Sequence, residues 1–197
     1  MGIFSIRTEF SKYGEYHANK VNIAIHMIFV PTILWTSLGI TTRLFPQELF
    51  TYPPLVSQIL SYIPGPSPLA NASTIAMMAY TLFYMILDPI AGVLIAPVIY
   101  SFLITSQQYA IHCSDSIKVM LALFVIAWVA QFIGHGVFEK RAPALVDNLV
   151  QALVMAPFFV FLEVLFACGY RPGLNRELRN EIGSRILAFR RQSKKSN

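Results

Sequence analysis

The sequence has little charge for its length. Only 13% of its 197 residues are Asp, Glu, Lys or Arg, whereas 55% are hydrophobic. A soluble domain of this size carries roughly a quarter charged residues, so the deficit argues against a water-soluble globular protein. A chain of this length is expected to form one domain, here residues 1–197. We therefore expect a single membrane domain whose partner is the lipid bilayer, with no nucleic acid among its partners.

Cysteine is also scarce. The two cysteines, Cys113 and Cys168, match no metal-binding spacing and provide no disulfide framework. A secretory signal is missing as well, because residues 1–20 carry several charged side chains and have no apolar core. The first apolar run is therefore expected to remain in the protein as a membrane helix.

Apolar runs occupy much of the remaining chain. There are five of them, at residues 21–40, 74–87, 90–105, 117–134 and 149–168. A bilayer span needs about 20 apolar residues, with a range of roughly 17–25, and the first, fourth and fifth runs are long enough. The second and third are shorter and join at Asp88-Pro89, which favours a helical hairpin that Asp88 caps. The sequence thus predicts an all-α, polytopic membrane bundle of about five to six apolar segments.

Basic residues lie outside these runs and indicate the orientation of the chain. They gather in residues 1–20, in the loop after the fourth run and in residues 169–197. Because cytosolic loops are rich in Lys and Arg, we expect a cytosolic N-terminal segment, a transmembrane bundle over 21–168 and a basic cytosolic tail. Four spans already return the chain to the cytosol. We therefore expect residues 149–168 to bend at Pro157 and return, as a re-entrant segment or hairpin. A single kinked span with a lumenal tail is the alternative.

The end of the sequence suggests a compartment. The last four residues, 194–197, read KKSN and resemble the dilysine retrieval signal of endoplasmic reticulum membrane proteins, which is read from the cytosol. Together with the charge asymmetry, this predicts a multi-pass protein of that membrane with both termini in the cytosol. Residues 174–195 form a charged amphipathic stretch, expected to be a helix near anionic headgroups.

Histidine is rare, and its positions suggest a site. The four histidines are His17, His26, His112 and His135. Ionisable groups inside membrane segments are uncommon and usually functional. Asn19 and His26 share one helix face. His17 reaches this face only if the chain bends just before Asn19, which can cap the helix. The start of the first span and the end of the fourth lie on the same side of the membrane. Three of the histidines can therefore converge, whereas His112 is expected in a loop on the opposite side.

A cluster of three imidazoles predicts a metal site without identifying the metal. Neutral imidazoles with open positions suit Fe, Zn, Cu or Ni. Glu139 lies one helical turn after His135, and three roles are open to it. It can be a fourth ligand, it can accept a hydrogen bond from a histidine ring, or it can pair with Lys140 or Arg141.

Two stretches of the sequence carry a family resemblance. YGEYHANKVNIAIHMIFVPTIL at 13–34 and WVAQFIGHGVFEKRAPALVDNLVQALVMAPFF at 128–159 resemble the fungal 2-hydroxy-fatty-acid dioxygenases of the endoplasmic reticulum, which act in phytosphingosine breakdown. The resemblance covers most of the chain and is weakest at 41–73. The motif positions fall on His17, His26, His135, Glu139, Arg141 and Pro143.

The resemblance implies an activity and a set of roles. It implies an Fe(II)-dependent enzyme that uses O₂ to shorten a 2-hydroxy fatty acid by one carbon, with release of CO₂. The implied iron ligands are His17, His26 and His135, and the catalytic candidates are Glu139, Lys140 and Arg141. One of the two cations would hold the substrate carboxylate while the metal orients both reactants. The alternatives are a zinc-dependent membrane lipid hydrolase and a non-catalytic lipid-binding or membrane-shaping protein. The oligomeric state stays open.

Overall fold

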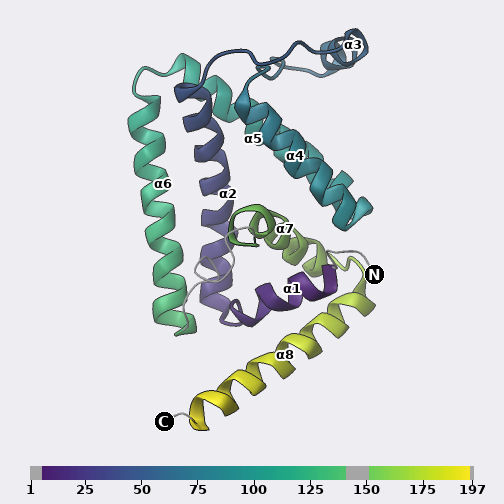
Figure 1. Cartoon of the computed structure of the whole chain (residues 1–197), viewed down its shortest axis with the longest axis vertical. Coiled ribbons are helices and arrows are strands. Elements are labelled where there is room, and N and C mark those ends of the chain that lie inside the picture. Colours follow the sequence, from purple (N-terminus) through teal and green to yellow (C-terminus); the bar gives the residue numbers. More distant parts are fainter. Residues whose placement is uncertain (1–5, 141–150, 196–197) are drawn as a thin grey trace. The chain divides into compact units, whose positions relative to one another are not determined.

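The computed structural model describes residues 6–140 and 151–195, and these form helices joined by turns and loops (Figure 1). The helices are α1 (Ile6–Glu15), α2 (Lys20–Leu44), α3 (Pro54–Tyr62), α4 (Ala72–Leu87), α5 (Pro89–His112), α6 (Ser116–Ile133), α7 (Ala156–Ala167) and α8 (Pro172–Lys195). Two π-helical segments are η1 (Gly134–Glu139) and η2 (Gln151–Met155). No strand occurs in the described ranges, so the all-α prediction is confirmed.

The helices provide fewer membrane spans than the sequence predicted. Three are long and apolar enough to cross a bilayer, namely Lys20–Leu44, Pro89–His112 and Ser116–Glu139. The pair Leu153–Ala167 and Pro172–Ala188 would make a fourth if it is one broken span. The predicted five to six apolar segments are therefore more than the three or four spans found in the described chain. Part of the difference is α4, which is apolar but only 16 residues long, slightly below the usual length of a span.

By their contacts, the described residues divide into two compact units. The first unit combines Met1–Val30 with Val129–Asn197, and the second is Pro31–Trp128. In the second unit, α4 and α5 form the hairpin that was predicted at Asp88-Pro89. The Asp88 side chain accepts a hydrogen bond from the backbone N–H of Ala91 at 3.1 Å, so it caps α5. A proline at the first position of a helix lacks only an N–H that would have no partner there.

A buried group of polar side chains joins elements of the second unit. We call Asn71, Ser73, Thr74 and Gln107 the amide cluster. Gln107 Nε2 donates to Ser73 Oγ at 2.9 Å and to Asn71 Oδ1 at 3.2 Å. Its Oε1 accepts from the backbone N–H of Leu69 at 2.9 Å. One α5 side chain therefore fixes the segment that leads into α4, while Asn71 caps that helix.

In the first unit, α1 packs against α8 and α7 (Figure 1). Phe10 is buried and meets the rings of Phe159 and Phe166 edge to face, each at a centroid distance of 5.4 Å. Gly14 lies where α1 and α8 approach, because a Cβ at this position would overlap the side chain of Ile182. These contacts hold α1, and the turn that follows it, in a defined position.

The last apolar segment bends as predicted, but not at Pro157. This proline lies in the first turn of α7, directly after the π-helical η2. The bend follows α7 instead. Gly169 and Arg171 adopt positive φ values of 89° and 42°, and the axes of Leu153–Ala167 and Pro172–Ala188 are bent by 119°. The predicted bend at Pro157 is therefore wrong in position.

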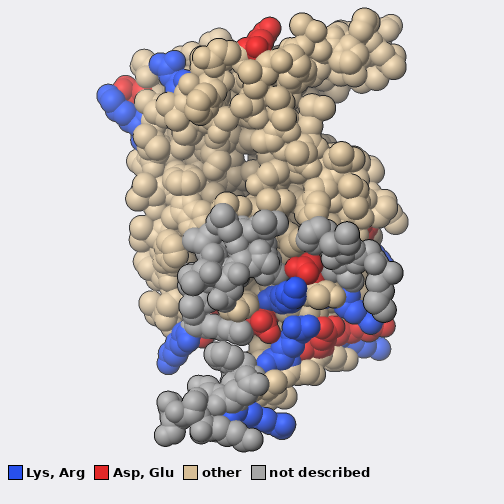
Figure 2. All heavy atoms as spheres, viewed as in Figure 1, with Lys and Arg blue, Asp and Glu red and all other residues tan. Residues whose placement is uncertain are grey.

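Charged side chains of the first unit gather over α1 and α8 (Figure 2). Both signs occur. Arg185 pairs with Glu181 at 3.0 Å, and Arg179 approaches Glu163 of α7 at 3.5 Å. Leu178 is fully buried although its neighbours on α8 are exposed. The tail helix is therefore amphipathic, as its sequence predicted.

Candidate metal centre

Three histidines from separate segments converge in the first unit. His17 lies in the turn between α1 and α2, His26 lies in the second turn of α2, and His135 lies in η1. Their ring centroids are 4.3, 4.8 and 4.9 Å apart, and one nitrogen of each ring lies within 4.8 Å of the others. Each side chain is at most 7% exposed. We call these three residues the His triad, and its members are the ones that the sequence predicted.

Backbone carbonyl groups set the protonation of two rings. His17 Nδ1 lies 2.7 Å from the carbonyl oxygen of Tyr13, and His26 Nδ1 lies 2.9 Å from that of Asn22. A carbonyl group only accepts, so each Nδ1 carries the proton and donates it. Each Nε2 of the neutral ring is then left with a lone pair. A metal-binding histidine commonly uses one nitrogen for the metal and the other for such a bond.

The other ring nitrogens of the triad have few partners. His135 Nε2 lies 3.1 Å from His26 Nε2. His17 Nε2 and His135 Nδ1 are buried and have no hydrogen-bond partner within the described chain. Buried polar atoms are normally paired, so the triad has capacity for a further partner. A transition-metal ion fits this donor set, because imidazole nitrogens suit Fe, Zn, Cu and Ni alike.

The surroundings of His17 favour its neutral form. Burial lowers the pKa of His17 well below its ordinary value of 6.5, and the nearby His26 lowers it further. Tyr13 stacks on the ring with a centroid distance of 3.8 Å and an interplanar angle of 17°. Burial also raises the pKa of Tyr13 above its ordinary value. At neutral pH both groups are therefore uncharged, and His17 keeps a free lone pair.

Tyr13 is a contact of the triad that sequence reasoning missed. The signal was present in YGEYH, because residues four apart on a helix are neighbours. The stacking could not be predicted because His17 lies just beyond the end of α1. Only the turn after α1 brings the two rings into parallel contact.

Glu139 connects η1 to the start of α2. Its Oε1 accepts from the backbone N–H of Asn19 at 2.6 Å and from Asn22 Nδ2 at 3.3 Å. Asn19 Oδ1 accepts from the N–H of Val21 at 2.8 Å, which agrees with the predicted cap of α2. Among the residues described, no histidine ring donates to Glu139, since each triad nitrogen has either another partner or none. Glu139 therefore holds the segments that carry the triad.

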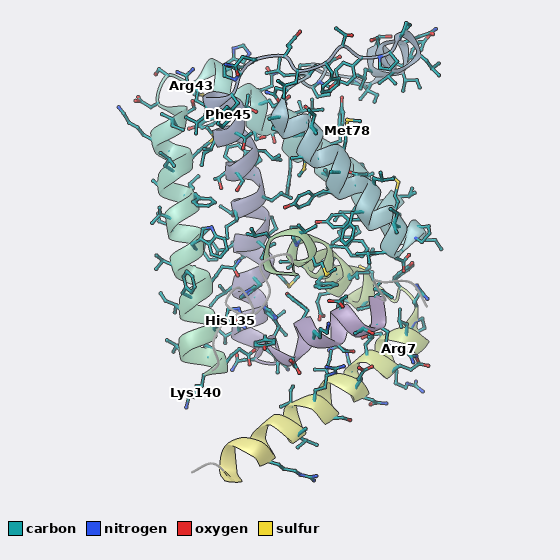
Figure 3. All side chains as sticks on the ribbon, in the orientation of Figure 1. Arg7, Arg43, Phe45, Met78, His135 and Lys140 are labelled. Carbon is teal, nitrogen blue, oxygen red and sulfur yellow. The ribbon has the colours of Figure 1, made fainter. Side chains whose placement is uncertain are left out.

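Of the remaining residues that the sequence singled out, Lys140 and His112 lie within the described parts of the chain. Lys140 directly follows η1, has a φ of 53° and is exposed, and Figure 3 labels it beyond His135. Arg141 and Pro143 lie outside the described residues. His112 is the exposed last residue of α5, where it bonds Gln108 at 3.0 Å. It is not part of the triad, as the sequence predicted.

Comparison with known proteins assigns the chain to a family. A family model described as "2-hydroxy-palmitic acid dioxygenase Mpo1-like" matches residues 3–168, which include the whole triad. The chain is 37% identical over 194 residues to the 2-hydroxy-palmitic acid dioxygenase MPO1 of Saccharomyces cerevisiae, an alignment that covers 97% of this chain and 98% of that protein. No solved structure matches significantly. The chain thus belongs to the Mpo1-like family.

Proposed function

We propose that the protein is an Fe(II)-dependent dioxygenase that converts a 2-hydroxy fatty acid into the fatty acid one carbon shorter. The observation that carries the proposal is the His triad, three buried imidazoles whose ligand nitrogens lie within 4.8 Å of one another in a member of this family. The balanced reaction is R–CH(OH)–COOH + O₂ → R–COOH + CO₂ + H₂O. The organic acid loses four electrons and one O₂ accepts four, so no organic cosubstrate is needed.

The triad residues would hold the metal. His17 and His26 would bind through Nε2, because their Nδ1 atoms are committed to the carbonyl oxygens of Tyr13 and Asn22. When bound, Fe(II) supplies the redox chemistry and orients substrate and O₂. The two carbonyl groups prevent ring rotation, and the stacked Tyr13 covers one face of His17. The protein therefore presents its ligands in a fixed arrangement.

Cations after the triad would bind the polar end of the substrate. Lys140 is exposed at the end of η1, and Arg141 follows it in the sequence. Either cation can bind a carboxylate by a charge-assisted hydrogen bond. Glu139 supports this segment through its bonds to Asn19 and Asn22. The acyl chain would lie among lipid tails, since a 2-hydroxy fatty acid has a polar head and an apolar tail.

The proposed location is the endoplasmic reticulum membrane, with both termini in the cytosol, and the proposed role is in sphingolipid breakdown. The basic residues of 1–20 and 169–197 and the KKSN sequence at 194–197 support this orientation. The chain is proposed to act as one membrane domain. Fusion of a reporter to each terminus, followed by protease treatment of sealed microsomes, tests the orientation.

The activity is tested with protein purified without oxygen, stripped of metal and reloaded with Fe(II). With 2-hydroxypalmitate we expect pentadecanoate and CO₂, with one O₂ consumed per acid. Folded His135→Ala protein should bind no iron and form no product. His112→Ala protein should still bind iron and form product. Product formed without iron would overturn the proposal. Ester hydrolysis by Zn(II)-loaded protein without O₂ would indicate a lipid hydrolase, and full function of triad variants in cells would indicate a non-catalytic lipid-binding role.

A further inference from the structure

We propose that Asn22 is the positioning residue that holds the three ligand-bearing segments together, so that the metal affinity of the triad depends on its side chain. The proposal rests on the proposed function, since it concerns the metal held by the triad. Asn22 is fully buried in the first turn of α2, one turn before His26. A buried amide at this place needs partners, and the partners it has are the reason for the proposal.

Asn22 contacts all three segments that supply the triad. Its Nδ2 donates to the carbonyl oxygen of Tyr16 at 3.2 Å, in the turn that carries His17. The same Nδ2 donates to Oε1 of Glu139 at 3.3 Å, at the end of η1, which carries the third histidine. Its own carbonyl oxygen accepts from His26 Nδ1 at 2.9 Å. A single residue therefore hydrogen-bonds to each of the three segments that carry the triad.

The orientation of the Asn22 amide follows from its partners. Both groups near Nδ2 are acceptors, a carbonyl oxygen and a carboxylate oxygen. An exchange of Nδ2 and Oδ1 would place three acceptors together, so only one orientation is compatible with the contacts. Oδ1 then faces Gly134, where a Cβ would overlap it. The residue before His135 must be small for Asn22 to fit, so the two segments are fitted to each other.

The start of α2 resembles a capping box that is completed by another segment. In a capping box, the side chain of a Glu or Gln at the third helical position accepts from the backbone N–H of the N-cap residue. Asn19 is the N-cap here, and Asn22 occupies the third position. Glu139 supplies the acceptor instead, at 2.6 Å from the N–H of Asn19. The amide of Asn22 acts as a second donor to this carboxylate, which fixes η1 and therefore His135.

Metal binding without substrate tests the role of Asn22. In Asn22→Asp the shape is kept, but both donors are lost and a negative charge faces Glu139. We expect Co(II) affinity of the metal-free protein in detergent to fall about 10–100-fold, with a changed visible Co(II) spectrum. Thr36→Val is the matched control. Thr36 is also buried on α2, and its hydroxyl bonds only to Thr32 and Ile33 of its own helix within the described chain.

Each outcome has a defined meaning. Wild-type protein that binds neither Co(II) nor Fe(II) would overturn the proposed function. If the wild type binds Co(II) and Asn22→Asp binds it with the same affinity and spectrum, only the role of Asn22 is overturned. A lower melting temperature with an unchanged Co(II) spectrum would assign a structural role and also overturn the proposal.

A second variant keeps the test decisive if Asn22→Asp does not fold. Glu139→Gln retains an acceptor oxygen and removes the charge, so a smaller loss of Co(II) affinity is expected. The pair Asn22→Ser and Glu139→Gln should be non-additive, because Glu139→Gln weakens the hydrogen bond that Asn22→Ser removes. Additive losses would show that Asn22 does not position the triad through Glu139.

Discussion

Each unit contains a buried group of polar side chains, but the two groups differ in how they are satisfied. In the amide cluster of the second unit, Gln107 both donates and accepts, and it reaches Asn71, Ser73, Thr74 and Leu69. Of the side-chain atoms in this cluster, only Asn71 Nδ2 is buried without a partner in the described chain. In the His triad, by contrast, the Nε2 atoms of His26 and His135 lie 3.1 Å apart, and His17 Nε2 and His135 Nδ1 lack a partner in the described segments.

This difference shows what distinguishes a structural cluster from a site. Burial is common to both groups, so burial alone does not indicate function. The amide cluster pairs donors with acceptors, and all of its side-chain groups except Asn71 Nδ2 have partners in the described chain. The triad brings three ring nitrogens within 4.8 Å of one another, and the Nε2 lone pairs of His17 and His26 among them suit a bound cation. If the two clusters differ in this way, changes in one of them should leave the other intact.

The largest effect is expected from His26→Ala. The variant removes the ring whose Nε2 lies 3.1 Å from His135 Nε2, and a two-histidine site has lost a third of its protein ligands. Iron content should fall to background, and product formation should fall by at least about 100-fold. Mutation of residues that only hydrogen-bond to metal ligands already lowers metal affinity or activity by about 10–100-fold. Metal analysis, turnover and circular dichroism measure the three quantities. A variant that is folded, iron-loaded and active would remove His26 from the site.

Gln107→Leu should affect stability and leave the metal site intact. The change leaves the N–H of Leu69 and the acceptors near Gln107 Nε2 without their partner. We expect the free energy of unfolding to fall by about 1–3 kcal/mol, measured by denaturant titration in detergent. Iron content per folded molecule should equal that of the wild type. Loss of iron in protein that remains folded would contradict the separation of the two clusters.

Local signals in the sequence and the order of the spans were enough to predict which histidines converge and where two helices begin. Asn19 before an apolar run predicted a cap, and the structure has it. Asp88-Pro89 predicted a hairpin, because both residue types favour the start of a helix. The convergence of the triad followed from the side of the membrane on which each run begins or ends. Each of these inferences needed only neighbouring residues or the order of the spans.

Other features depended on contacts between distant segments. Pro157 looked like a bend because a proline near the middle of an apolar run breaks a helix, but α7 begins just before it. The role of Asn22 needs Glu139, 117 residues away in the sequence. No periodicity shows such a pair. The pairing of Glu139 with Asn19 and Asn22, rather than with a histidine ring, could be found only from the structure.

The metal-free protein should lose stability in mild acid. Burial holds the pKa of folded His17 well below 6.5, so the unfolded chain takes up a proton at about pH 6.5 and the folded chain does not. Below that pH the unfolded state binds more protons, and stability falls toward the folded pKa by at most about 1.4 kcal/mol per pH unit. Above it the contribution is constant. Unfolding of chelator-treated protein at several pH values measures the slope. His17→Asn should reduce it, whereas Gln107→Leu should leave it unchanged.

The smallest effect is expected from Lys140→Ala, with Lys118→Ala in the second unit as its match. Both lysines are exposed, and Lys118 pairs with Asp115 at 2.8 Å. If Lys140 binds the substrate carboxylate, its loss should raise the KM for 2-hydroxypalmitate by about 2–5-fold, because an exposed ion pair contributes at most about 1 kcal/mol. The kcat and the iron content should change little, since no triad atom is altered. Lys118→Ala should leave KM as it is. Equal increases in both variants would mean that general positive charge attracts the anionic substrate, and would remove Lys140 from the binding site.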